Sequence, residues 1–140
     1  MFFFPSGTIH AIGKGCLICE IQQNSNLTYR VYDYGRKDKN GNERELHIDK
    51  ALKVTNLNKF VPITFEDCLA QCKYFTVEKY GINGEKQLFV DEKSFQCVTC
   101  VKGDGFIEDI KINQGDSFFI PAGYGNYTID GELKIISTKI

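Results

Sequence analysis

The side chain with the clearest chemical potential is His10, one of two histidines in the 140-residue sequence. An imidazole can bind a transition-metal ion or move a proton near neutral pH. A histidine taken alone is more often a packed or surface residue than a ligand, so the flanking sequence must show which role His10 has. His10 follows Pro5-Ser6-Gly7-Thr8-Ile9, a turn set after an aromatic run.

Arg30 is the second candidate, within Thr28-Tyr29-Arg30-Val31-Tyr32-Asp33-Tyr34. Strand alternation there places Arg30 on one face with Tyr32 and Tyr34. A guanidinium keeps its charge and can bind phosphate or a developing oxyanion through two hydrogen bonds. The same pattern also fits a surface cation lying over aromatic rings.

Three further polar residues are weaker candidates for substrate binding: Lys14, Glu20 and Gln22. Lys14 is flanked by glycines close to His10, where a solvated turn lysine is the simpler interpretation. Glu20 and Gln22 either line the wall of an active site or face outward from a strand. The residue pattern favours neither interpretation.

The six cysteines include the pairs Cys16-x2-Cys19 and Cys97-x2-Cys100. Two such pairs can form a zinc ribbon. Both lie in apolar, β-favouring runs, where residues three positions apart point to opposite faces of a strand. We therefore expect strand cysteines that are reduced, as is usual in the cytosol.

Charge and hydropathy exclude several classes of partner. The net charge is −1, which provides no basic field for nucleic acid. No apolar run approaches the roughly 20 residues that span a bilayer, which excludes a membrane protein. The apolar opening lacks the basic segment of a signal peptide, so we expect a cytoplasmic protein.

The elements that position these residues are predicted to be short strands. The first group covers 2–4, 9–12, 16–22 and 28–34. Residues 36–71 form a connector, with a short helix over 45–53 and helical turns over 65–71 after Thr64-x2-Asp67. A second group of strands covers 73–80, 87–90, 95–101, 106–110, 117–120, 127–129 and 132–138, with glycine turns between them.

The chain also contains an internal repeat. Phe2-Phe3-Phe4-Pro5-Ser6-Gly7 aligns with Phe118-Phe119-Ile120-Pro121-Ala122-Gly123, and the polar residue three positions further on is His10 in one copy and Asn126 in the other. The second copy, Gly115-Asp116-x4-Pro121-x-Gly123-x2-Asn126, resembles the second motif of the cupins. In metal-binding cupins the last position is a histidine ligand. This resemblance implies that the C-terminal barrel has lost its metal.

The N-terminal copy is similar to a narrower group. It resembles the type I mannose-6-phosphate isomerases, in their short bacterial branch. The resemblance is carried by residues 5–13, residues 28–33 and Arg44-Glu45-Leu46-His47. The resemblance implies an all-β, cupin-type double-stranded β-helix (jelly roll) with short connector helices. Residues 1–35 are then the last strands of an incomplete catalytic barrel, 36–71 the connector and 72–140 a second, non-catalytic barrel.

The resemblance also implies a chemistry. In the family a zinc ion held by His, Gln and Glu assists a 1,2 proton transfer between mannose 6-phosphate and fructose 6-phosphate. His10 is then a zinc ligand and Arg30 the catalytic arginine, and the phosphorylated hexose is the substrate. His47 is expected on the surface of the connector.

The family's enzymes are about twice as long, so we expect this chain to be an inactive C-terminal fragment that does not bind zinc tightly. The alternative is a stand-alone, non-catalytic single-cupin protein that binds a sugar or a partner. In either case the N-terminal strands have exposed edges, which predicts a homodimer through them.

Overall fold

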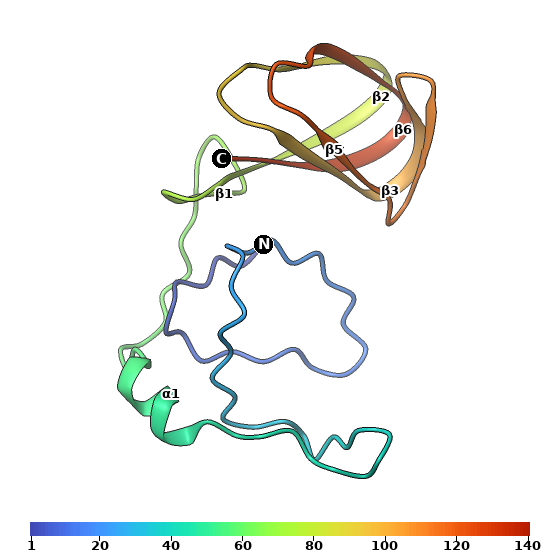
Figure 1. Cartoon of the computed structure of the whole chain (residues 1–140). Helices are drawn as coiled ribbons and strands as arrows, with labels where there is room; N and C mark the ends of the chain where they lie inside the picture. The colour runs from blue at the N-terminus through green and yellow to red at the C-terminus, as the bar shows by residue number, and fades with distance from the viewer. The chain divides into compact units, whose positions relative to one another are not determined.

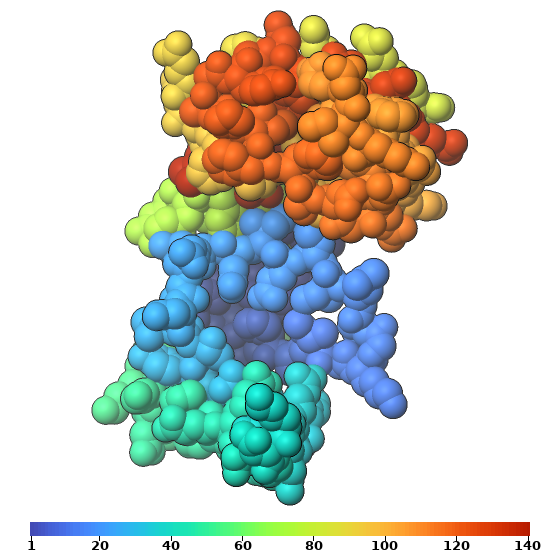
Figure 2. Space-filling view, turned by 45° about the vertical axis from the view of Figure 1, so that its right-hand side comes forward, coloured from blue at the N-terminus to red at the C-terminus, as the bar shows by residue number.

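The strands of the protein all lie between Ala70 and Lys139, in a computed structural model that describes residues 1–140. The chain divides into two units, residues 2–63 and residues 64–140, with Met1 assigned to the second. In the space-filling view, the residues of the second unit from yellow to red form one continuous packed body (Figure 2). No helix in the structure has the length and apolar character needed to cross a membrane.

The second unit is a curled antiparallel sheet (Figure 1). β6 is its central strand, paired with β2 along its whole length and with β3 on its other side. The neighbours run in the order β1-β2-β6-β3-β4, and β5 also pairs with β3. The predicted all-β fold is confirmed. The strands are β1 (Ala70–Gln71), β2 (Thr76–Val90), β3 (Gln96–Ile107), β4 (Ile110–Asn113), β5 (Ser117–Ile120) and β6 (Gly125–Lys139).

The core of this unit is formed by side chains from one face of each strand. Along β3 and β6 buried and less buried positions alternate, as the two-residue period of a strand requires. Aliphatic side chains dominate, and Tyr127 is the largest fully buried residue. The cluster comprises Ile82, Val90, Val98, Cys100, Ile107, Ile112, Ile120, Tyr127, Ile129, Leu133 and Ile135.

The glycines expected to separate short strands instead lie inside long ones, and this prediction was wrong at three places. β2, β3 and β6 each run through their glycine clusters without a break. A Cβ atom on Gly105 would lie 2.1 Å from the Asp130 carbonyl oxygen, and one on Gly103 would lie 2.0 Å from that of Glu132. These glycines allow β3 and β6 to approach closely where the sheet bends.

The connector contains one of the two predicted helical segments. Helix α1 covers Ile48–Val54, inside and just beyond the expected range, and the Ala51 amide donates to the His47 carbonyl. The helical turns predicted over 65–71 are not formed. Leu69 donates its amide to the Val77 carbonyl, so this segment joins the edge of the sheet as β1.

The strands predicted over 2–4, 9–12, 16–22 and 28–34 are also not formed in the first unit. A strand needs a regular ladder of backbone hydrogen bonds with a neighbour, and none of these segments belongs to a β-ladder of this chain. Several of their apolar side chains remain exposed, such as Leu17 (91%). The unit is instead joined by single hydrogen bonds, such as that from the Asn56 amide to the Gly7 carbonyl, and by a bridge between Lys37 and Glu43.

Candidate functional site

His10 has the orientation of a potential metal ligand. Its Nδ1 lies 2.9 Å from the Thr8 carbonyl oxygen. A carbonyl can only accept, so Nδ1 carries a proton, and in the neutral ring Nε2 then keeps a free lone pair. The ring also stacks on Phe4, with centroids 4.7 Å apart, and Phe4 contacts Phe60. A backbone carbonyl on the far nitrogen is the usual way in which proteins orient a ligating imidazole.

The rest of a zinc site is not assembled by this chain. No three His, Cys, Asp or Glu side chains gather where they could hold a metal ion. Cys97 is half-buried and Cys100 buried on β3, while Cys16 and Cys19 are both exposed. The residues present therefore fit one ligand of a zinc site and not a complete coordination shell.

Arg30 is half-buried and held by its own surroundings. Its Nη1 donates to the Glu45 carbonyl at 3.4 Å, and its Nε lies 3.9 Å from Asp33 Oδ1. Asp33 in turn accepts two hydrogen bonds from the Arg44 guanidinium. The cation that lies over an aromatic ring of this segment is Arg36, whose guanidinium carbon is 5.4 Å from the Tyr34 centroid. Arg30 is therefore not the ring-stacked surface cation that the pattern also allowed.

Three arginine side chains act on the Asp33 carboxylate. The hydrogen bond from Arg44 lowers the pKa of the Asp33 carboxyl group, and the charges of Arg44, Arg30 and Arg36 act in the same direction. One carboxylate thus faces three guanidinium groups. A cluster of guanidinium groups of this kind can attract an anionic ligand.

His47 was expected on the surface, and that expectation was wrong. Its side chain is 19% exposed. Its Nδ1 accepts a hydrogen bond from the Arg30 amide at 3.3 Å, and its own amide donates to the Arg30 carbonyl at 2.7 Å. No local signal in the sequence points to this contact, because the two residues lie 17 positions apart.

The three weaker candidates do not interact with His10 or Arg30. Lys14, Glu20 and Gln22 are exposed, and none of them makes a hydrogen bond or an ion pair with His10 or Arg30. Nor does any hydrogen bond link His10 to Arg30. The substrate roles of these three residues remain predictions.

In the second unit, the position that the repeat aligns with His10 is exposed. Asn126 lies on the outer face of β6, and its neighbour Tyr127 is 1% exposed inside the barrel. The Tyr127 hydroxyl donates to Gln96 Oε1 at 2.7 Å, and burial raises the pKa of this phenol. A paired tyrosine therefore fills the interior next to the position where the cupin motif has its ligand.

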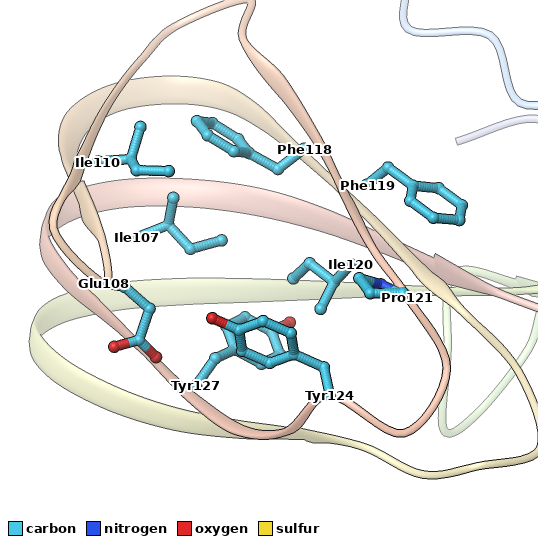
Figure 3. Close-up of a pocket in the computed structure, with 9 residues that line it drawn as sticks. All are labelled: Ile107, Glu108, Ile110, Phe118, Phe119, Ile120, Pro121, Tyr124 and Tyr127. Carbon is cyan, nitrogen blue, oxygen red and sulfur yellow. The ribbon is translucent and has the colours of Figure 1, made fainter.

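A hollow of about 150 Å³ lies beside this tyrosine (Figure 3). The Glu108 carboxylate stands at its edge and accepts a hydrogen bond from the Thr128 amide. The lining has no cationic side chain, so it does not suit a phosphorylated sugar. The lining residues are Ile107, Glu108, Ile110, Phe118, Phe119, Ile120, Pro121, Tyr124 and Tyr127.

Comparison with known proteins gives consistent matches. Residues 66–140 match the family model described as the cupin domain of mannose-6-phosphate isomerase. A putative mannose-6-phosphate isomerase of Bacillus subtilis, YvyI, is 39% identical over 99% of this chain and 48% of its own length. The mannose-6-phosphate isomerase ManA of the same organism is 35% identical, with the same coverage.

A solved structure agrees with these matches. The crystal structure of the mannose 6-phosphate isomerase from Bacillus subtilis superimposes with a TM-score of 0.71 at 34% identity. The match covers 84% of this chain and 42% of that one. The chain thus spans about half the length of the relatives it matches.

Proposed function

This chain belongs to the mannose-6-phosphate isomerase family, and from that premise we propose that it serves the interconversion of mannose 6-phosphate and fructose 6-phosphate. The observation that carries the proposal is similarity to named mannose-6-phosphate isomerases over 99% of the chain. That similarity includes the unit with His10 and Arg30. The reaction is a 1,2 proton transfer between an aldose phosphate and a ketose phosphate.

Arg30 is the residue that meets the negative charge of the substrate. Its guanidinium has five N–H donors, and the Glu45 carbonyl engages Nη1. Nε lies beside the Asp33 carboxylate, and the remaining donors can bind the phosphate or steady the charge of an enediolate. The cluster of three guanidinium groups around Asp33 supports this role.

His10 supplies one ligand of the zinc ion. The metal, when bound, polarises an oxygen of the sugar and stabilises negative charge on it. The Thr8 carbonyl fixes the imidazole so that Nε2 is the ligating atom. Because the chain completes no coordination shell, it binds zinc weakly by itself and has little or no turnover alone.

The exposed apolar side chains of the first unit need a covering surface, and a second copy of the chain supplies it. They include Ile9, Ile12, Leu17, Ile18 and Leu27. Light scattering is expected to give the mass of a dimer, and Leu17→Asp is expected to shift it toward the monomer. A monomeric wild-type chain at high concentration would contradict the dimer.

A coupled assay with mannose 6-phosphate tests the function. The chain alone, with and without zinc, is expected to give no metal-dependent turnover. Fusion to the part of the Bacillus subtilis isomerase that the match leaves uncovered is expected to give turnover. In that fusion His10→Ala and Arg30→Gln abolish activity.

Lys39→Gln removes one positive charge from an exposed loop and serves as the control, with activity unchanged. Robust turnover by the unfused chain would refute the incomplete zinc site. A folded fusion that is inactive, or that is indifferent to Arg30→Gln, would refute the proposed function.

A further inference from the structure

We propose that His47 is a positioning residue for Arg30, acting through the Arg30 main chain. The imidazole holds residue 30 in the place from which its guanidinium can reach an anionic substrate. The proposal rests on the proposed function only for what Arg30 binds. The contact between the two residues is independent of that function.

The two residues form a reciprocal pair of hydrogen bonds. The Arg30 amide donates to His47 Nδ1 at 3.3 Å, and the His47 amide donates to the Arg30 carbonyl at 2.7 Å. An accepting Nδ1 requires the proton of the neutral ring to be on Nε2. The Glu45 carboxylate lies 3.7 Å from Nε2 and favours this tautomer.

The segment 44–47 contacts the Arg30 region at three points. Arg44 holds the Asp33 carboxylate, which lies 3.9 Å from Arg30 Nε. The Glu45 carbonyl accepts from Arg30 Nη1. His47 holds the backbone. One four-residue segment therefore fixes both the main chain and the side chain of the arginine.

His47 also ties this segment to the helix. Its carbonyl accepts the Ala51 amide at 2.9 Å, and Ala51 is 4% exposed. The tyrosine before Arg30 lies against the imidazole ring, with centroids 6.3 Å apart. The half-buried ring thus has a fixed position from which Nδ1 can act.

Only some side chains can replace the imidazole here. An asparagine places its Oδ1 near the position of Nδ1 and can accept the Arg30 amide. A leucine has similar bulk and no acceptor. The pair His47→Asn and His47→Leu therefore separates the hydrogen bond from simple packing, and Lys50→Leu, exposed on α1, controls for changes to the helix itself.

Nuclear magnetic resonance of the whole chain tests the contact. In His47→Leu the Arg30 amide is expected to exchange with solvent about tenfold faster, the size expected for one net hydrogen bond. His47→Asn and Lys50→Leu keep the wild-type rate. In the wild-type protein the ring ¹⁵N shifts are expected to report the proton on Nε2. A ring protonated on Nδ1, or an unchanged exchange rate in His47→Leu, overturns the proposal, and the ring shifts decide it even if that variant does not fold.

Titration with inorganic phosphate tests whether His47 affects anion binding by Arg30. Arg30→Gln is expected to abolish binding, His47→Leu to weaken it severalfold and His47→Asn to restore it. If Arg30→Gln binds phosphate as the wild type does, the role of Arg30 fails and the exchange result still stands. If Arg30→Gln abolishes binding while His47→Leu binds normally, the role of Arg30 stands and the positioning role of His47 fails.

Discussion

Replacement of Tyr127 by phenylalanine measures what the polar pair inside the barrel contributes. Tyr127 is 1% exposed and Gln96 is 7% exposed, and the hydroxyl donates to Gln96 Oε1 at 2.7 Å. Tyr127→Phe leaves that oxygen buried without this partner. The free energy of unfolding is expected to fall by about 1–3 kcal/mol, the cost of a buried unsatisfied polar group.

A double-mutant cycle isolates the interaction itself. Gln96→Met keeps the approximate volume and leaves the Tyr127 hydroxyl unpaired, so its cost is expected to be similar. The double variant removes both polar groups and is expected to be more stable than the sum of the two changes predicts, by about 1–2 kcal/mol.

Urea unfolding followed by circular dichroism supplies the free energies. Tyr124→Phe is the control, because Tyr124 is 52% exposed and its ring contacts Tyr127 edge-on. Its cost is expected to stay within about 0.5 kcal/mol. If Tyr127→Phe costs no more than this control, or if the two changes simply add, the barrel does not depend on the pair.

Two further changes test the packing and the electrostatics. Gly105→Ala is expected to lower the free energy of unfolding in urea by about 3 kcal/mol, because its Cβ would meet the Asp130 carbonyl. Gly81→Ala, with open space around it, is expected to lower it by less than about 1 kcal/mol. Equal losses in the two variants would contradict the close approach of the strands at Gly105. The pKa of Asp33 is lowered in the folded chain, so its contribution to stability is complete above the ordinary aspartate pKa of about 3.9 and is lost as the pH falls through the lower folded value. Thermal melts from pH 6 to pH 2 are expected to show this loss in the wild type and a smaller loss in Arg44→Gln, because Arg30 and Arg36 still lower the pKa of Asp33.

Much of the C-terminal fold follows from local pattern. The strand predicted over 117–120 is β5 with the same bounds, since its aromatic and aliphatic residues end at Pro121 and pair with β3. The helix before Thr55 was also predicted, to within a few residues. In these segments local preference and tertiary contacts agree.

The errors have physical causes that a local pattern does not contain. Gly103 and Gly105 look like turn residues, and only the neighbouring strand shows that they are needed for a close backbone approach. His47 looks like a surface residue of a charged connector, and its partner Arg30 lies 17 positions earlier. Both errors concern contacts between residues far apart in sequence.

The two copies of the internal repeat differ in whether they form a strand. Residues 118–120 and residues 2–4 have nearly the same side chains before proline. Residues 118–120 form a β-ladder because β3 runs beside them, whereas residues 2–4 lie in no β-ladder of this chain. Strand preference is therefore a property of the residues, while the strand itself is a property of the residues and their neighbour.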